Sequence, residues 1–326
     1  MRAGTRGLVA AALAAAVPAW AEPPRGPGAS ERALVEEALS IAAGPGERVW
    51  PGWNAAPFDL VLVDGEHEYL ARSAQRPDGF APLAGATLGG GPVLARPRTF
   101  EPALLAAFPA FGGTPVIVVG TPSATGRDPG RWVLSVLHEH FHQLQYSRPG
   151  YYPAVDALGL KGGDSSGMWM LDYPFPYATP AVASAWRDLA GELAGQVEAG
   201  TAESRRAFWC RLAAFEARLA PRDRAYLDFQ LWQEGIARYV ELRVAEAAAA
   251  RATPGAAVSA STAADVRRSI LSRLREDRLE ERRREAFYAF GAALGLLLDE
   301  DRPAWKEAYF REWFSLPRLA AASCPR

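Results

Sequence analysis

The sequence lacks a large net charge and long apolar runs, and it has little histidine and cysteine. Several of these features exclude a class of partner or of structure. The chain has no excess charge of one sign, because 36 Lys and Arg residues are balanced by 37 Asp and Glu residues. A nucleic acid or an anionic membrane surface would attract a basic chain, so we expect neither as a partner. After the N-terminal segment, no apolar run reaches the ~20 residues that a membrane-spanning helix needs. Histidine and cysteine are also scarce, with four and two residues among 326.

The N-terminus has the features of a secretory signal peptide. Arg2 and Arg6 form a charged segment, residues 7–17 are apolar, and residues 19–21 (Ala-Trp-Ala) fit a small-residue cleavage site. An N-terminal membrane anchor is the alternative, but the apolar run has about half of the ~20 residues needed to span a bilayer. We therefore predict a signal peptide over residues 1–21 and an exported protein, either periplasmic or secreted.

The two cysteines, Cys210 and Cys324, are an even number in a chain that is predicted to leave the reducing cytosol. They fit either one disulfide bond that holds the C-terminal tail or two buried free thiols. Neither belongs to a CxxC pair or to a Cys/His cluster, which argues against either cysteine as a metal ligand.

Length and hydrophobic content are sufficient for a sizeable core, since 49% of the 326 residues are hydrophobic. Residues 58–63 and 115–119 are short β-branched runs bounded by Gly and Pro, as strands usually are, and residues 101–110 indicate a short helix. The rest of the chain is mostly helical in pattern. We therefore predict an α+β fold, with a small mixed β-sheet in an N-terminal subdomain (22–130) followed by a mostly α-helical subdomain (131–326).

Three of the four histidines fall within the run His138-Glu139-His140-Phe141-His142. An Asp-Pro pair precedes this run, and apolar residues recur around it at helical spacing, so we expect a helix here. Side chains four residues apart are neighbours on one helix face. The imidazoles of His138 and His142 are therefore expected to reach one metal ion.

This spacing is the HExxH arrangement, in which two histidines bind zinc and the glutamate acts as general base toward a water molecule. It predicts His138 and His142 as ligands of Zn²⁺ and Glu139 as the catalytic base. His140 points about 200° around the helix from His138, so we expect it in the core or hydrogen-bonded to backbone. The alternative is a chance match on a buried helix, which the scarcity of histidine disfavours.

A catalytic zinc site usually has three protein ligands and one open position, so a third ligand is needed. Glu234 and Glu241 stand on one face of an otherwise apolar helical segment, where a buried carboxylate needs a partner. Zinc is one such partner for Glu234, and an ion pair with Arg238 is the alternative. A site with Glu241 as the ligand is a further possibility that the pattern leaves open.

The segment around Glu234, which reads Trp-Gln-Glu-Gly-Ile-Ala-Arg-Tyr-Val-Glu, resembles the second zinc helix of gluzincin metallopeptidases, W-x-x-E-G-x-A-x-Y-x-E. The resemblance implies a zincin-like catalytic subdomain, Glu234 as the third zinc ligand and Glu241 as a supporting residue. Residues 288–291 (Tyr-Ala-Phe-Gly) are similar to the Y-x-K-G stretch of aminopeptidase-N and glycyl aminopeptidase enzymes. That similarity implies that Tyr288 donates a hydrogen bond to the oxyanion, whereas simple helix packing is the alternative.

The chain also departs from those aminopeptidases. The segment between the HExxH run and Glu234 is much longer, and the G-x-M-E-N string that recognises a free amino terminus is missing. The resemblance therefore implies a smaller, divergent gluzincin. We expect residues 116–119 to form an edge strand that pairs with an extended substrate, and the aromatic loop 151–177 either to wall the cleft or to pack passively.

The sequence as a whole predicts an exported zinc metallopeptidase that hydrolyses peptide bonds in a peptide or protein substrate. The alternative is a catalytically inactive, gluzincin-like exported binding protein that keeps the shape of the site without turnover.

Overall fold

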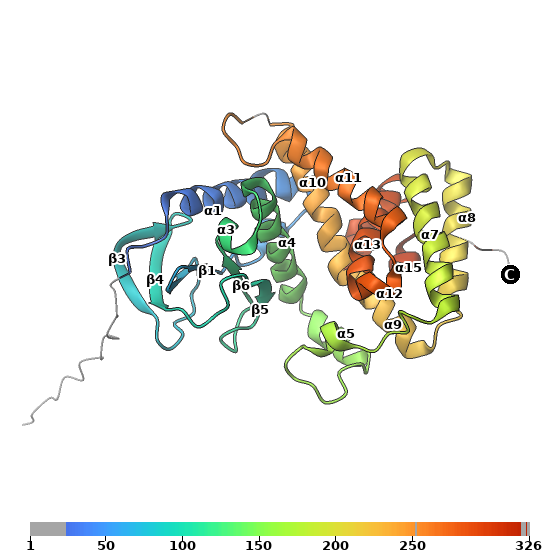
Figure 1. Ribbon diagram of the computed structural model, residues 1–326, viewed down its shortest axis with the longest axis horizontal. Helices are drawn as coiled ribbons and strands as arrows, with labels where there is room; N and C mark the ends of the chain where they lie inside the picture. The colour runs from blue at the N-terminus through green and yellow to red at the C-terminus, as the bar shows by residue number, and fades with distance from the viewer. Residues whose placement is uncertain (1–23, 252, 321–323, 325–326) are drawn as a thin grey trace, which may run out of the picture.

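The computed structural model describes residues 24–251, 253–320 and 324. The predicted signal peptide, residues 1–21, lies outside these residues. A mixed β-sheet occupies the N-terminal half and helices make up most of the C-terminal part, so the predicted α+β class is confirmed (Figure 1). Among the described helices, none is both long enough and apolar enough to cross a bilayer.

The described strands form one six-stranded sheet in the order β3-β4-β2-β1-β6-β5. β1 runs parallel to β6, and the other neighbouring strands pair antiparallel. The strands are β1 (Leu60–Asp64), β2 (His67–Ala71), β3 (Ala81–Leu88), β4 (Gly91–Pro97), β5 (Leu105–Phe108) and β6 (Val116–Gly120).

Two of our predictions for this region are wrong. Residues 116–119 do not form an edge strand, because β6 lies between β1 and β5, and β5 is the edge. Residues 101–110 do not form a helix, because Leu105–Phe108 pairs antiparallel with β6. Pro102 and Pro109 leave too short a segment for a stable helix, and pairing with a buried strand overrides the helix propensity of its Leu and Ala residues.

Strands β1 and β6 are buried on both faces, which explains why they read as continuous apolar runs. On one face, Leu60, Leu62 and Ile117 join the main core, in which the sheet packs against α1 and α4. On the other face, Val61 and Val118 belong to a smaller cluster covered by partly buried phenylalanines. Helices and short helical turns before α5 are α1 (Ala29–Ile41), η1 (Ala42–Gly46), α2 (Glu47–Val49), η2 (Trp53–Ala55), α3 (Pro122–Thr125) and α4 (Pro129–Ser147).

Helix α4 joins the two parts of the molecule, since it contacts β5 and β6 on one side and α10 on the other (Figure 1). The Asp128 side chain caps it by accepting a hydrogen bond from Arg131 N at 3.0 Å. The Trp132 indole donates to the carbonyl oxygen of Gly120 at 2.7 Å. A Cβ at Gly120 would lie 1.7 Å from the Pro102 carbonyl oxygen, so only glycine fits at this junction.

The C-terminal part is a bundle of helices around α13 (Figure 1). Its elements are α7 (Pro180–Ala199), α8 (Ala202–Glu216), α9 (Pro221–Gln230), η3 (Leu231–Gly235), α10 (Ile236–Ala249), α11 (Ala260–Glu276), α12 (Leu279–Arg282), η4 (Arg283–Glu285), α13 (Ala286–Asp301), α14 (Trp305–Tyr309) and α15 (Leu316–Ala320). The segment between the sheet part and this bundle, predicted as a loop, contains two short helices, α5 (Tyr151–Ala157) and α6 (Trp169–Asp172).

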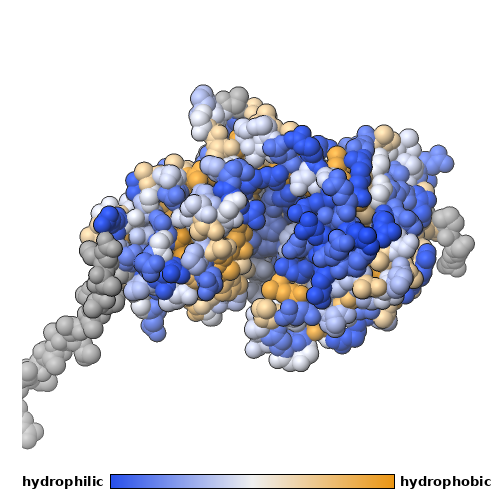
Figure 2. Space-filling model, viewed as in Figure 1, coloured by the Kyte–Doolittle hydropathy of each residue, from blue (hydrophilic) through white to orange (hydrophobic). Residues whose placement is uncertain are grey.

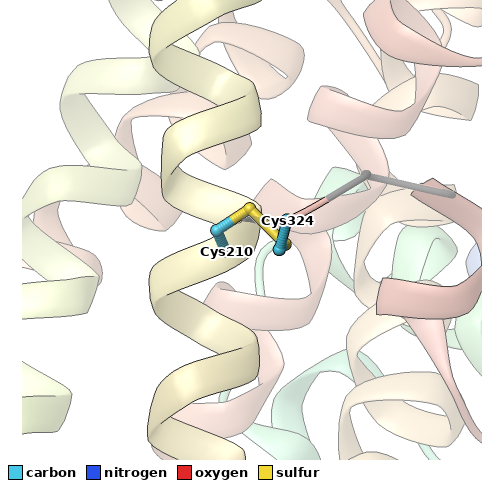
Figure 3. The surroundings of a disulfide bond; sticks show 2 residues. All are labelled: Cys210 and Cys324. Atoms are coloured by element: carbon cyan, nitrogen blue, oxygen red, sulfur yellow. A yellow bond between two sulfur atoms is a disulfide. The ribbon is translucent and has the colours of Figure 1, made fainter. Parts of the chain in front are cut away.

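The two cysteines form a disulfide bond, which decides between the two alternatives for them. Cys210 lies on α8 and bonds to Cys324 beyond α15, with their Cα atoms 5.4 Å apart (Figure 3). The bond closes a long segment of chain and therefore restricts the unfolded state. It attaches the C-terminal end to the outer helix of the bundle.

Candidate metal centre

His138 and His142 on α4 converge with Glu234 of η3, and one ligand atom of each lies within 4.8 Å of the others. The two Nε2 atoms are 3.0 Å apart. Glu234 Oε2 lies 3.5 Å from His138 Nε2 and 3.4 Å from His142 Nε2. Two ligand atoms held about 2.05 Å from one zinc ion at tetrahedral angles lie roughly 3.3 Å apart. The three donors therefore fit a tetrahedral ion with one position left open.

Each histidine uses its other ring nitrogen to bond a fixed partner. His138 Nδ1 lies 2.7 Å from Glu241 Oε1, and His142 Nδ1 lies 2.6 Å from Gln145 Oε1. Gln145 donates its amide N–H groups to the Gln233 carbonyl and the Tyr309 hydroxyl, so its oxygen must face the imidazole. We infer that both Nδ1 atoms carry protons, which leaves both Nε2 lone pairs directed at the shared position.

The electrostatics of this cluster favour a cation. Burial opposes the charge of His138, but hydrogen bonds with Glu234 and Glu241 raise its pKa to about 10. Burial likewise opposes the charge of Glu241, yet Arg238 and His138 lower its pKa to about 2. Around Glu234 the histidines also outweigh burial and hold its pKa well below the ordinary glutamate value. The cluster therefore favours a positive charge, which without a metal is a proton on His138 facing Glu234. A metal ion would displace that proton and take the Nε2 lone pair.

The positions of Arg238 and Glu241 argue against two alternatives, an ion pair between Glu234 and Arg238 and a site with Glu241 as the metal ligand. Arg238 pairs with Glu241 rather than with Glu234, so the ion pair that would have explained Glu234 without a metal is not formed. Glu241 lies behind the ring of His138, on its Nδ1 side, rather than among the converging donors. This is the position of a carboxylate that orients a metal-binding histidine.

Glu139 is buried between α4 and the edge of the sheet. Its Oε2 accepts a hydrogen bond of 2.7 Å from the backbone N–H of Ala107 on β5. The predicted base therefore lies beside both the histidine pair and an edge strand. β5 pairs with another strand only along its β6 side.

The remaining histidines do not join the cluster. His140 is buried, its Nδ1 lies 3.1 Å from Gln143 Oε1, and its ring packs on Trp53 and Phe58. Burial lowers the pKa of His140 to about 4, so it is a neutral core residue, as its position on the helix predicted. His67 lies at the start of β2.

Two tyrosines flank the histidine pair. The ring of Tyr288, on α13, is nearly parallel to that of His138, with centroids 6.2 Å apart. Tyr146, one turn beyond His142, stacks on it with centroids 5.9 Å apart. Burial and the charge of Glu234 raise the pKa of both phenols well above the ordinary value, so both remain hydrogen-bond donors. The sequence singled out Tyr288 but missed Tyr146.

A contact between two glycines explains why Glu234 and Tyr288 lie in the same region. A Cβ at Gly235 would lie 2.5 Å from the Gly291 Cα, so the backbones of η3 and α13 touch. Each glycine follows a site residue closely in the chain, in the Glu-Gly pair and in the Tyr-Ala-Phe-Gly run. Glu234 itself lies in a π-helical turn, a distortion that is frequent at functional sites.

Comparisons of this chain with protein-family models, curated proteins and solved structures found no match. The resemblance to gluzincins therefore rests on short motifs alone, and a function has to be inferred from the geometry of the His138, His142 and Glu234 side chains.

Proposed function

We propose that this protein is an exported, zinc-dependent peptidase. The observation that carries the proposal is the arrangement of His138, His142 and Glu234, whose donor atoms are spaced for one tetrahedral ion and whose histidines are oriented by outer partners. Nitrogen and carboxylate donors with one open position are typical of catalytic zinc sites. A structural zinc site would use four protein ligands instead.

The residues around the cluster have the chemistry that hydrolysis of an amide needs. A bound zinc ion supplies a lowered pKa for water and polarisation of a carbonyl group. Glu139 takes a proton from the attacking water as the new C–O bond forms, and it returns a proton to the amine as the C–N bond breaks. Tyr288 and Tyr146 are neutral donors beside the histidines, and Tyr288 is our choice for the donor to the developing oxyanion.

For the path of the substrate we propose a surface recess near the centre. A recess lies between the sheet-bearing part and the helical part, over the position of α4, with apolar residues more frequent on the sheet side (Figure 2). β5 borders the centre through Ala107, whose N–H binds Glu139. We therefore place an extended substrate backbone along β5, in place of the residues 116–119 that the sequence suggested.

The decisive experiment replaces Glu139 with Gln, which keeps an oxygen able to accept the Ala107 N–H bond. We expect one zinc per chain in both proteins, measured by mass spectrometry, and hydrolysis of a peptide library only by the wild type. Loss of a general base typically costs 10²–10⁴-fold in rate, so we expect a drop of about 10³-fold. A matched control is Glu192→Gln, a partly exposed partner of Arg211 far from the site in sequence.

Two outcomes would contradict the proposal. Cleavage by Glu139→Gln at the wild-type rate would exclude this residue as the base. A wild-type protein that binds zinc yet cleaves no peptide, with or without a chelator, would favour the alternative of a binding protein without turnover.

A further inference from the structure

An arginine without an acidic partner stands beside the candidate metal centre. Arg284 is half-buried, and its Nη1 donates a hydrogen bond of 2.6 Å to the Tyr288 hydroxyl. Its guanidinium also lies 5.6 Å from the centroid of that ring. Tyr288 in turn stacks on His138, so two contacts connect Arg284 to the histidine pair.

Two other arginines of the same segment are paired with carboxylates. Arg278 binds Glu280, and Arg282 lies 3.4 Å from Asp277. Within the described part of the chain, no Asp or Glu lies within ion-pair distance of Arg284. A half-buried guanidinium with one N–H fixed on a tyrosine and no carboxylate partner is arranged to bind an anion that the chain does not provide.

The neighbouring residue extends this cationic edge. Arg283 has a positive φ of 51°, which a residue with a side chain rarely adopts, and its guanidinium lies 5.3 Å from the ring centroid of Tyr177. Strained backbone of this kind occurs preferentially at functional sites. Arg283, Tyr177, Pro176 and Glu280 help to line an open hollow of about 620 Å³ on the surface.

The charges around Arg284 keep it cationic in this position. Burial opposes the charge, but the phenol of Tyr288 and the carboxylate of Glu234 raise the pKa of Arg284. Glu234 is engaged with the two histidines, so it does not neutralise the guanidinium directly. Arg284 therefore presents a fixed positive charge between the donor cluster and the hollow beside Tyr177.

We propose that Arg284 binds a carboxylate of the peptide substrate next to the scissile bond, with Arg283 adding a second positive charge farther out. This inference rests on the proposed peptidase function and narrows its substrate class to peptides with a carboxylate at that position. The carboxylate is either the C-terminus of the peptide or the side chain of an acidic residue. A planar guanidinium fork pairs with a carboxylate through two parallel hydrogen bonds, which makes the contact selective.

The test measures peptide binding rather than cleavage, so it is independent of turnover. Zinc-loaded Glu139→Gln protein is titrated with fluorescent peptides of one sequence that carry a free or an amidated C-terminus, and with Asp or Asn at each position near the cleavage point. Whichever carboxylate is recognised, we expect its removal to weaken binding about 10–100-fold, since a hydrogen bond to a charged group contributes roughly 1.5–3 kcal/mol.

Adding Arg284→Gln should abolish that difference by weakening binding of the carboxylate peptide while leaving the neutral peptide unchanged. Arg284→Lys keeps the charge but lacks the fork, so we expect an intermediate loss. Arg282→Gln, on the same segment but already paired with Asp277, is the matched control and should bind like its parent. Circular dichroism and zinc content confirm that the variants fold.

Equal binding of carboxylate and neutral peptides by the parent protein would overturn the inference. It would also be overturned if Arg284→Gln weakened binding of both peptides to the same extent, because Arg284 would then only hold Tyr288 in place. A failure of the proposed function would give a different result. The wild-type protein would then bind the carboxylate peptide more tightly than the neutral one but would cleave neither.

Discussion

Two pairs of buried acidic residues in the helical part show how strongly neighbours decide the behaviour of a carboxylate. Glu234 and Glu241, on η3 and α10, face histidines and Arg238. Glu216 and Asp228, on α8 and α9, are also buried, but both oxygens of Glu216 and one of Asp228 have no hydrogen-bond partner among the described atoms. The first pair is held by two histidines and Arg238, whereas the second has one longer-range partner, Arg224, at 3.6 Å from Glu216 and 3.7 Å from Asp228.

The difference appears in their proton affinities. Histidines and Arg238 outweigh burial and lower the pKa values of Glu234 and Glu241. Burial raises the pKa values of Glu216 and Asp228, and Arg224, 3.6 Å from Glu216, offsets it only partly. Burial alone therefore does not identify a metal ligand. A carboxylate that stays ionised in the core marks a place where a cation binds.

The largest expected effect is that of Glu234→Ala. Removal of one of the three protein donors should weaken zinc binding by more than the 10–100-fold that the loss of an outer partner typically costs, and should abolish hydrolysis. Glu216→Ala removes another carboxylate from the interior of the helical part and should leave zinc content unchanged. Competition with a chromogenic chelator measures both affinities. Zinc retained by Glu234→Ala but lost by Glu241→Ala would reverse our assignment of ligand and support.

Glu241→Gln should have a smaller effect on the same measurement. Glutamine keeps an oxygen near His138 Nδ1 but removes the negative charge that makes the imidazole a stronger ligand, so we expect zinc affinity to fall about 10–100-fold. Glu246→Gln is a matched control, because Glu246 lies on the same helix and pairs with Arg243 and Arg267 rather than with a histidine. Equal zinc affinities for the two variants would show that Glu241 is merely structural.

The sequence predicted much of the first pair and nothing of the second. The spacing of His138 and His142 follows from helix geometry alone, and the motif around Glu234 supplied its partner across a long stretch of chain. Glu216 and Asp228 gave no such signal, since they lie among Arg and Asp residues typical of a solvated surface. The Glu216 side chain becomes buried only because α8 packs against the neighbouring helices.

The structure also supplied details that no local pattern contains. The Gly235 and Gly291 contact depends on how two helices cross, which sequence spacing does not specify. The edge of the sheet is β5 and not the predicted β6, because residues that we predicted as a helix form β5 and pair with β6. In the sequence Arg284 is the last of three consecutive arginines. That it has no carboxylate partner among the described residues appears only when the neighbouring ion pairs are known.

The smallest expected effect concerns Glu216, which lies beside Asp228, and it is an effect on the stability of the fold that depends on pH. A carboxyl group whose pKa is higher in the folded chain binds its proton more tightly there, so its contribution to stability is lost as the pH rises from the ordinary glutamate range toward the folded pKa. Glu216 faces Asp228 and Arg224, and its raised pKa places this loss between mildly acidic and alkaline pH.

Because glutamine does not titrate, Glu216→Gln should unfold at a higher urea concentration than the wild type at pH 8. We expect a gain in the free energy of unfolding of about 1–2 kcal/mol, the order of the cost of an unsatisfied buried group. At pH 5 the gain should shrink toward zero, whereas the partly exposed control Glu192→Gln should show no such trend. If Glu216→Gln were no more stable at pH 8 than at pH 5 relative to the wild type, this carboxylate would have to be compensated in the folded chain, and the contrast with Glu234 would disappear.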